Sequence, residues 1–170
     1  MRHFADSAKI FKIIKSLIKD KNRKNHSICD IGSGAGFPGL VLNILNEEFK
    51  FNIDITLIES SHKKCLFLES IRKKLKLDCK IRNARAESLE TRYDIIVARA
   101  VAPLERLVKI SYNIKEKGSS LIFLKGKNWQ KEIAQIKKQW KFNMNIVKND
   151  ILIDTSGGVT LVLKNLEKKR

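Results

Sequence analysis

Glycines are concentrated in one short segment that could bind a small molecule through its backbone. Residues 27–40 read Ser-Ile-Cys-Asp-Ile-Gly-Ser-Gly-Ala-Gly-Phe-Pro-Gly-Leu, a β-rich run, a glycine-rich turn and the start of a helical pattern. Glycine tolerates positive φ angles and lets the backbone approach a ligand closely, while the free amides of a following helix favour a negative group. We therefore expect a ligand-binding turn here. The competing explanation is a tight turn that needs glycine for its geometry alone.

Two classes of cofactor fit this turn, and the register of the glycines distinguishes them. Gly34, Gly36 and Gly39 satisfy the dinucleotide pattern GxGxxG. Glu59 follows twenty residues later, where an acid that binds ribose is expected. Counted from the strand end, however, Asp30 stands just ahead of a GxGxG pattern, the arrangement seen in S-adenosylmethionine-dependent methyltransferases. An acid there would crowd a pyrophosphate, but it could order the loop and face the ammonium group of S-adenosylmethionine, which favours the second cofactor.

Two further charged residues stand at the ends of β-rich runs. A carboxylate at Glu59 can accept hydrogen bonds from both hydroxyls of a ribose, or it can cap the helix expected from Ser61. Lys125 follows the fifth run, at the edge where ligands bind in open α/β folds. Contact with a substrate is one interpretation of Lys125, and a solvated strand-end charge like Lys127 is the other.

Alternating elements along the chain would position these residues. The β-rich runs are 27–31, 53–58, 79–83, 94–98 and 120–124, and the helical patterns between them are 38–45, 61–77, 103–114 and 129–140. Regular alternation with right-handed crossovers predicts a parallel sheet covered on both faces. Two final runs, 145–153 and 160–166, are joined by the turn signal Thr155-Ser-Gly-Gly and predict an antiparallel hairpin. The expected fold class is α/β and Rossmann-like, mostly parallel with this C-terminal hairpin.

The first 20 residues carry apolar side chains at steps of three and four and predict an amphipathic helix. Its expected core-facing residues are Phe4, Ala8, Phe11, Ile14 and Ile18. The polar stretch 20–26 would end the helix. Because the sequence has no internal repeat and no Pro-rich or Ser-rich linker, we expect a single domain over 1–170, with a Rossmann-like core from about 27 to 166.

The chain is strongly basic. It has 170 residues, of which 35 are Lys or Arg and 18 are Asp or Glu, giving a net charge of +17. Such a charge favours a polyanionic partner. Lys outnumbers Arg 26 to 9, and Ile and Asn are also plentiful. An AT-rich genome would produce this bias without any selection for binding.

Several classes of protein are disfavoured by composition. No apolar run approaches the roughly 18 residues that span a bilayer, and the first residues lack the sections of a secretory signal. The three cysteines include no CxxC pair, and His26 and His62 have no partners at metal-ligand spacing. We expect a cytoplasmic protein without membrane contact, disulfide framework or metal.

Four motifs follow one another along the chain: Arg2-His-Phe-Ala-Asp-Ser, Asp30-Ile-Gly-Ser-Gly-Ala-Gly-Phe-Pro-Gly-Leu, Ala98-Arg-Ala-Val-Ala-Pro-Leu and Leu124-Lys-Gly. In this order they resemble the motifs of the bacterial 16S ribosomal RNA guanine-7 methyltransferases, also called the glucose-inhibited division protein B family. The resemblance runs from residue 2 to about 166. It implies a Rossmann-like methyltransferase that uses S-adenosylmethionine, with small-subunit ribosomal RNA or the ribosomal subunit as its partner. We expect a monomer.

The resemblance also implies roles for individual residues. By motif, Gly32, Phe37, the pair Ala86-Glu87, and Arg99 match cofactor-binding positions of the family. Together with the residues argued above, the expected cofactor site comprises Asp30, Gly32, Gly34, Gly36, Phe37, Glu59, Ala86, Glu87 and Arg99. The expected RNA contacts are Arg2, His3 and Lys125. Taken by itself, Arg99 could equally be a surface or phosphate-contacting arginine.

No side chain is assigned a catalytic role. Nitrogen 7 of guanine carries a lone pair in the neutral base, so it can attack a sulfonium methyl group without first losing a proton. His3 next to Arg2 could be a catalytic pair, but such a pair at a helix start more often packs against the core or contacts phosphate.

The chain departs from the family pattern in two places. Members of the family carry several helices before the Arg-His pair, whereas one residue precedes it here. A basic residue leads into their last strand, where this chain has Gly157-Gly158-Val159. Both differences predict weaker engagement of RNA.

Overall fold

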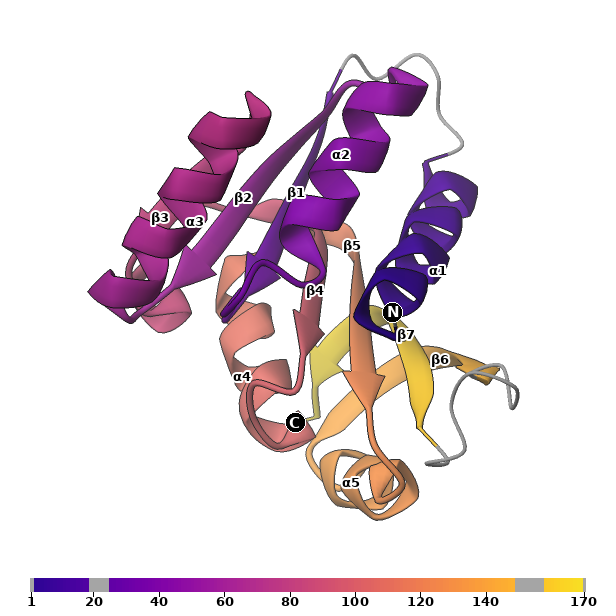
Figure 1. Cartoon of the computed structure of the whole chain (residues 1–170). Helices are drawn as coiled ribbons and strands as arrows, with labels where there is room; N and C mark the ends of the chain where they lie inside the picture. Colours follow the sequence, from indigo (N-terminus) through magenta and orange to yellow (C-terminus); the bar gives the residue numbers. More distant parts are fainter. Residues whose placement is uncertain (1, 19–24, 149–157, 170) are drawn as a thin grey trace.

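A central β-sheet organises the part of the chain that the computed structural model describes, residues 2–18, 25–148 and 158–169 (Figure 1). The strands within these ranges are β1 His26–Ile31, β2 Ile53–Glu59, β3 Lys80–Asn83, β4 Tyr93–Arg99, β5 Lys115–Lys125, β6 Trp140–Lys148 and β7 Val159–Lys168. Their order across the sheet is β3-β2-β1-β4-β5-β7-β6. The first five strands are parallel, and β7 is antiparallel to both β5 and β6. The expected α/β fold and its C-terminal antiparallel hairpin are confirmed.

Helices cover both faces of the sheet. They are α1 Arg2–Leu17, α2 Gly39–Phe49, α3 His62–Leu75, α4 Leu104–Ile114 and α5 Trp129–Ile136, with one 3-10 turn, η1 Ala86–Ser88. The apolar residues of α1, α2 and α3 pack on one face, and those of α4 and α5 pack on the other (Figure 1). Because β1 to β5 run parallel, the loops that follow them all lie at the carboxyl edge of the sheet.

Alternation along the central strands explains why they read as continuous apolar runs. On β4, Ile95 and Val97 face the α1–α3 layer, whereas Ile96 and Ala98 face α4 and α5. A parallel strand covered on both sides is apolar at every position. The fully buried Phe123 of β5 belongs to the α4 side.

The expected bounds of β1 to β4 are accurate within one residue at each end, but other boundaries are wrong: α2 ends at Phe49 and not at 45, and β6 begins at Trp140 and not at 145. β5 begins at Lys115, five residues before the expected start, because Lys115 pairs with Tyr93 ahead of a register shift and residues 115–119 carry no apolar signal. The expected helix over 129–140 ends at Ile136, and Trp140 instead begins β6, buried against the ring of Tyr112.

The core-facing side of α1 is also different from the prediction. Ile10, Phe11 and Ile14 are buried as part of the core, but Phe4 is 57% exposed and Ala8 is exposed. The helix is rotated so that its polar residue Ser7 is buried and donates a hydrogen bond to the His3 carbonyl at 2.7 Å. Phe4 then lies at the end of the helix and packs edge-on against Phe37, with ring centroids 5.0 Å apart.

Some predictions fall outside the described residues. These are the end of the helix expected over 1–20, most of the polar stretch 20–26, the end of the strand expected to reach residue 153, and most of the turn at 155–158. Gly157, part of the second departure from the family pattern, is among them, while Gly158 and Val159 are buried at the start of β7.

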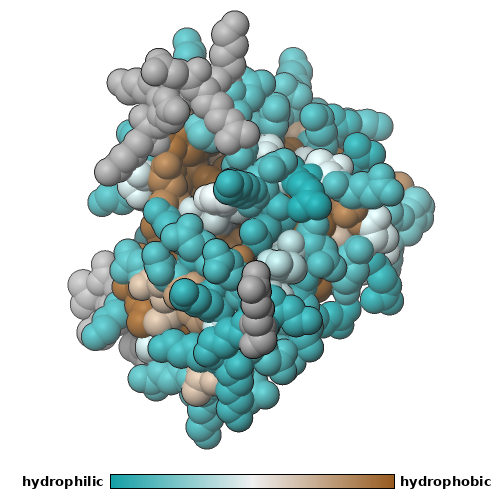
Figure 2. Space-filling view, turned by 180° about the vertical axis from the view of Figure 1, so that it is seen from behind, coloured by the Kyte–Doolittle hydropathy of each residue, from teal (hydrophilic) through white to brown (hydrophobic). Residues whose placement is uncertain are grey.

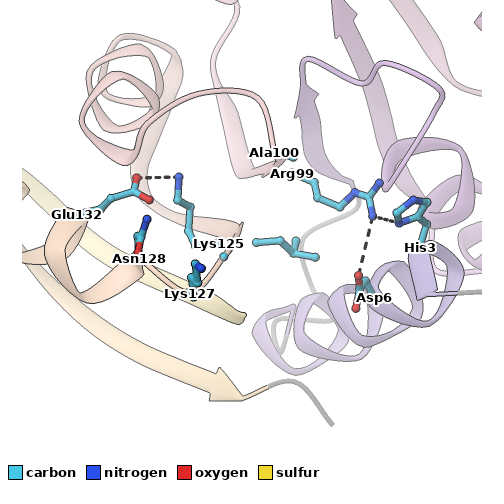
Figure 3. Close-up of a pocket in the computed structure, with 10 residues that line it drawn as sticks. His3, Asp6, Arg99, Ala100, Lys125, Lys127, Asn128 and Glu132 are labelled. Atoms are coloured by element: carbon cyan, nitrogen blue, oxygen red, sulfur yellow. Dashed lines mark hydrogen bonds and ion pairs between the residues drawn. The ribbon is translucent and has the colours of Figure 1, made fainter. Parts of the chain in front are cut away.

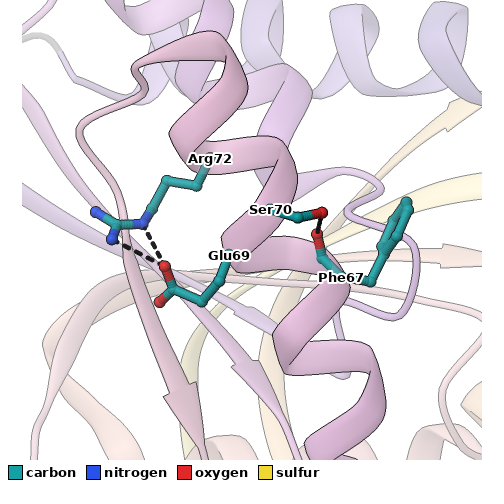
Figure 4. Close-up of polar contacts among 4 residues, drawn as sticks. All are labelled: Phe67, Glu69, Ser70 and Arg72. Carbon is teal, nitrogen blue, oxygen red and sulfur yellow. Dashed lines mark hydrogen bonds and ion pairs between the residues drawn. The ribbon is translucent and has the colours of Figure 1, made fainter.

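One face of the molecule, opposite the one seen in Figure 1, is mostly hydrophilic. Figure 2 shows hydrophilic residues over most of the far face, with apolar residues in separate patches. Polar side chains of α3 also bond to one another and to the helix backbone (Figure 4). The Arg72 guanidinium donates to the Glu69 carboxylate, one helical turn away, at 2.8–2.9 Å, and the Ser70 hydroxyl donates to the Phe67 carbonyl. Cys29, Cys65 and Cys79 are free and buried.

The described residues contain neither a candidate membrane-spanning helix nor a candidate metal cluster. None of their helices is long and apolar enough to cross a bilayer. They also contain no group of three or more His, Cys, Asp or Glu side chains arranged to hold a metal ion.

The contact between α2 and the sheet yields a test of the packing. Gly39 begins α2, and a Cβ there would lie 2.7 Å from Asp30 Oδ2 and 2.8 Å from Leu57 Cγ. We expect Gly39→Ala to lower the free energy of unfolding by about 1–3 kcal/mol in urea denaturation, because the added methyl group overpacks this contact. Gly126→Ala is the control, since a Cβ at Gly126 meets nothing within 4 Å. Equal denaturation midpoints for the two variants would contradict the packing described.

Candidate functional site

The expected site residues meet at the carboxyl edge of the parallel strands. β1 pairs with both β2 and β4, so that Ile31 lies opposite Ile58 on one side and Ala98 on the other. The three strands therefore end level with one another. The residues that follow, Gly32 and Arg99 among them, start from the same edge of the sheet (Figure 1).

The glycine loop is held by the neighbouring strand. The amides of Gly32 and Ser33 both donate to the Ile58 carbonyl, at 2.8 and 3.1 Å. Gly32, Gly34 and Gly36 all have positive φ angles, of 66°, 57° and 92°. A side chain is disfavoured in this region of φ, and a Cβ at Gly32 would also lie 2.7 Å from the Val101 side chain. Glycine is thus required here by backbone geometry.

Glu59 links the glycine loop to the next helix. Its carboxylate is buried, and it accepts hydrogen bonds from the Gly34 amide at 3.0 Å and from the Ser61 amide at 2.9 Å. Ser61 is the N-cap residue of α3, so the helix-capping interpretation of Glu59 describes one of its two contacts. Binding to a ribose stays a prediction.

Asp30 lies beneath the glycine loop. It is 1% exposed, and its Oδ2 accepts a hydrogen bond from the Gly39 amide at the start of α2, at 2.9 Å. Its Oδ1 has no hydrogen-bond partner among the described residues. Burial raises the pKa of Asp30 to about 7. The carboxyl group thus binds the point where the loop enters α2, and its interaction with the ammonium group of a cofactor stays a prediction.

A pocket of about 240 Å³ opens beside the glycine loop. Its walls include Gly32 and Ser60 at the strand ends, Ala86 and Glu87 of η1, and Val101 after β4. The pocket therefore joins segments that are far apart in the sequence, from Ile31 to Ile110. Val101 was missed by sequence analysis, although it belongs to the Ala98-Arg-Ala-Val motif.

Glu87 is fixed by a partner that the sequence did not indicate. Its carboxylate accepts from the Arg106 guanidinium of α4 at 2.9 Å. A hydrogen bond from its own backbone amide, followed by the bond from Arg106, lowers the pKa of Glu87. Arg106 also lines the pocket, which makes it a further candidate site residue.

Arg99 joins the first helix to the glycine loop. Its guanidinium contacts His3 Nδ1, lies 3.9 Å from Asp6 Oδ2, and sits 5.7 Å from the centre of the Phe37 ring (Figure 3). Three of the four sequence motifs thus meet at one side chain. Asp6 was not predicted, but its place in the Arg2-His-Phe-Ala-Asp-Ser motif was a signal for it. Arg2 begins α1, and its side chain is outside the described part of the structure.

A second, larger pocket of about 520 Å³ is lined by Arg99 itself. Lys125, Lys127 and Glu132 line it together with His3 (Figure 3). Lys127 is exposed, but the Lys125 side chain is only 10% exposed and pairs with Glu132 at 2.8 Å. The interpretation of Lys125 as a solvated strand-end charge is therefore wrong, because β5 brings its ammonium group against the carboxylate of α5.

The order of the strands defines the class of protein. A sheet ordered 3-2-1-4-5-7-6 with an antiparallel seventh strand is the class I S-adenosylmethionine-dependent methyltransferase fold, whereas dinucleotide-binding sheets are ordered 3-2-1-4-5-6. The solved structure of TYW2 from M. jannaschii, in complex with AdoMet, has the same fold at 13% sequence identity. It matches with a TM-score of 0.70 over 99% of this chain and 77% of that one.

Sequence comparison identifies the family. Residues 1–153 match the GidB model, described as rRNA small subunit methyltransferase G. The protein of that name from Caulobacter vibrioides is 35% identical over 85% of this chain, and the one from Paramagnetospirillum magneticum is 31% identical over 99% of it. The aligned regions span 63% and 76% of those proteins, so the chain spans less than two thirds of the first. The chain belongs to the rRNA small subunit methyltransferase G family.

The buried position of Asp30 predicts a pH-dependent stability. Its pKa is about 7 in the folded protein and near 3.8 when unfolded, so the folded state binds the extra proton between these values. Stability should therefore fall as the pH rises from about 4 to about 7. Asp30→Asn lacks this ionisation. The free energy of unfolding of this variant, minus that of the wild type, should therefore rise by up to about 4 kcal/mol between pH 4 and pH 7. Urea denaturation at a series of pH values measures the difference; a constant difference would contradict the assignment.

Proposed function

We propose that the protein transfers a methyl group from S-adenosylmethionine to nitrogen 7 of a guanine in small-subunit ribosomal RNA. The observation that carries this proposal is the pocket of about 240 Å³ at the carboxyl edge, where Gly32, Ala86 and Glu87 line one space. Membership of the methyltransferase family and the class I fold support the same conclusion. The guanine atom follows from the resemblance of the motifs.

The glycine loop has room for a cofactor. A Cβ at Gly34 would meet no atom closer than 3.8 Å, so the space beside this residue is open. Each oxygen of the Glu59 carboxylate has two acceptor sites and uses one for a backbone amide, which leaves capacity for the hydroxyls of a ribose. The residues present therefore fit S-adenosylmethionine. When bound, it supplies a methyl group activated by the sulfonium.

Individual residues take the following roles in this proposal. Gly32, Gly34 and Gly36 bring the backbone close to the cofactor, Glu59 binds its ribose, and the segment of Ala86 and Glu87 meets its adenine. Asp30 binds the start of α2 from beneath the loop, and its ionised form attracts the cofactor's ammonium group. Phe37 and Arg99 close the side that faces the larger pocket.

The chemical step requires positioning more than proton transfer. Because nitrogen 7 carries its own lone pair, no side chain has to remove a proton from the guanine. Holding the two reacting atoms in line at near-attack distance is worth up to about 7–11 kcal/mol in favourable systems. The pocket beyond Arg99 is placed to hold the unstacked base, since it shares Arg99 with the glycine-loop side of the site.

The net charge of +17 suits a polyanionic substrate. His3 is exposed at the mouth of the larger pocket, and Arg2 precedes it in α1, so both are proposed to contact RNA phosphates. The alternative is that the protein is a basic RNA-binding domain of the same fold that no longer catalyses methyl transfer.

The proposal is tested by methyl transfer. Small ribosomal subunits from a strain that lacks its methyltransferase of this family should accept a tritiated methyl group from S-adenosylmethionine when the protein is added. Digestion of the RNA should then yield labelled 7-methylguanosine. Binding of subunits without transfer would support the RNA-binding alternative, and a label at another guanine atom would contradict the assigned position.

Two glycine variants connect this activity to the loop. Gly34→Val should lose activity and cofactor binding, because the side chain occupies the space beside the loop. Gly118→Val is the matched control: Gly118 has a positive φ of 84° and an equally open surrounding, but it lies in β5 far along the strand from the site. If both variants lose activity, backbone strain and not occupation of the cofactor space explains the loss.

A further inference from the structure

Lys125 and Glu132 form a partly buried ion pair that binds backbone groups of a neighbouring loop. The Lys125 ammonium donates to Glu132 Oε2 at 2.8 Å and to the Ala102 carbonyl at 3.1 Å. The same Glu132 oxygen accepts from the Leu104 amide, the first residue of α4, at 2.6 Å. The pair thus links the ends of β5 and α5 to the segment between β4 and α4 (Figure 3).

The segment 100–103 needs such support. Ala100 has a φ of 51°, a conformation that costs energy for a residue with a Cβ and persists where the surroundings enforce it. The groups that the ion pair binds, the Ala102 carbonyl and the Leu104 amide, lie just after Ala100. The pair therefore fixes the path of the chain from the strained residue into α4.

This segment forms the wall between the two pockets. Arg99 and Ala100 line the larger pocket, whereas the next two residues, Val101 and Ala102, line the smaller one. The Val101 side chain also lies against Gly32, where a Cβ would come within 2.7 Å of it. A shift of the segment would change both pockets together.

We propose that Lys125 and Glu132 are positioning residues that set the wall between the cofactor pocket and the pocket for the target base. This inference rests on the proposed function for the identity of the two ligands. It replaces the prediction that Lys125 contacts RNA, because the ammonium group already has two internal acceptors and its charge is balanced by Glu132. Neither side chain takes part in the chemical step.

The test compares two lysines at the same pocket. Lys125→Met and Lys127→Met each remove one positive charge from the lining of this pocket. Among the described residues, however, the exposed Lys127 makes no hydrogen bond to the 100–103 segment. By calorimetry, Lys125→Met should weaken S-adenosylmethionine binding by about tenfold, within the range known for residues that touch neither ligand. Lys127→Met should leave that affinity unchanged. Both should weaken binding to RNA to a similar, small extent.

Glu132→Gln tests whether the two residues act as a unit. The Gln oxygen can still accept from Leu104, so this variant should be milder. The double variant should bind S-adenosylmethionine no more weakly than Lys125→Met alone, because the effects of a coupled pair are not additive. Full additivity of the two effects would contradict the proposal.

Hydrogen exchange supplies a readout that does not depend on any ligand. The amides of residues 100–104, Pro103 excepted, should exchange faster in Lys125→Met than in Lys127→Met, while the strands keep their protection. If Lys125→Met fails to fold, the same comparison is made with Glu132→Gln. Unchanged exchange in this segment, or a loss of RNA affinity with cofactor affinity intact, would overturn the proposal. If the wild type binds no S-adenosylmethionine, the proposed function fails while the exchange experiment still tests the ion pair.

Discussion

The site depends on the buried carboxylate of Glu59, which joins the loop after β1 to the end of β2. Burying a charge is costly unless hydrogen bonds replace water, and here the amides of Gly34 and Ser61 supply them. The positive φ angles of the glycines turn the loop toward this acceptor. Because β1 also pairs with β4, the same arrangement fixes where Arg99 and the following segment begin. The glycine loop and the segment after β4 therefore start from one hydrogen-bonded corner of the sheet.

Three acidic residues of this basic protein hold backbone amides near the site. Asp30 binds the start of α2, Glu59 binds the glycine loop and the start of α3, and Glu132 binds the start of α4. Each carboxylate thus accepts from an amide at or next to a helix N-terminus, where a negative charge is favoured by the helix dipole. The loops at the carboxyl edge are held by these acids and stay available to ligands, while the excess of positive charge suits a polyanion.

Much of this arrangement could be predicted from the sequence, and the rest could not for identifiable reasons. Strands such as β1 and β2 follow from short apolar runs, and the glycine turn follows from composition. The predicted orientation of α1 was wrong because Phe4 packs against Phe37. These residues are 33 positions apart, and helical periodicity carries no information about such a contact. The burial of Lys125 was missed for the same reason, since its partner Glu132 is visible only once β5 and α5 are placed. Local patterns predict elements, whereas side-chain partners depend on tertiary packing.

A nuclear magnetic resonance titration of the isotopically labelled chain tests the central claim most directly. With S-adenosylmethionine, the account predicts that the amide signals of residues 32–36, Ser60 and 86–87 shift together and saturate at one equivalent, while NAD at the same concentration leaves them unchanged. This set is the glycine loop together with residues that line the smaller pocket. Shifts confined to other parts of the chain, or a response of these amides to NAD and not to S-adenosylmethionine, would contradict the account.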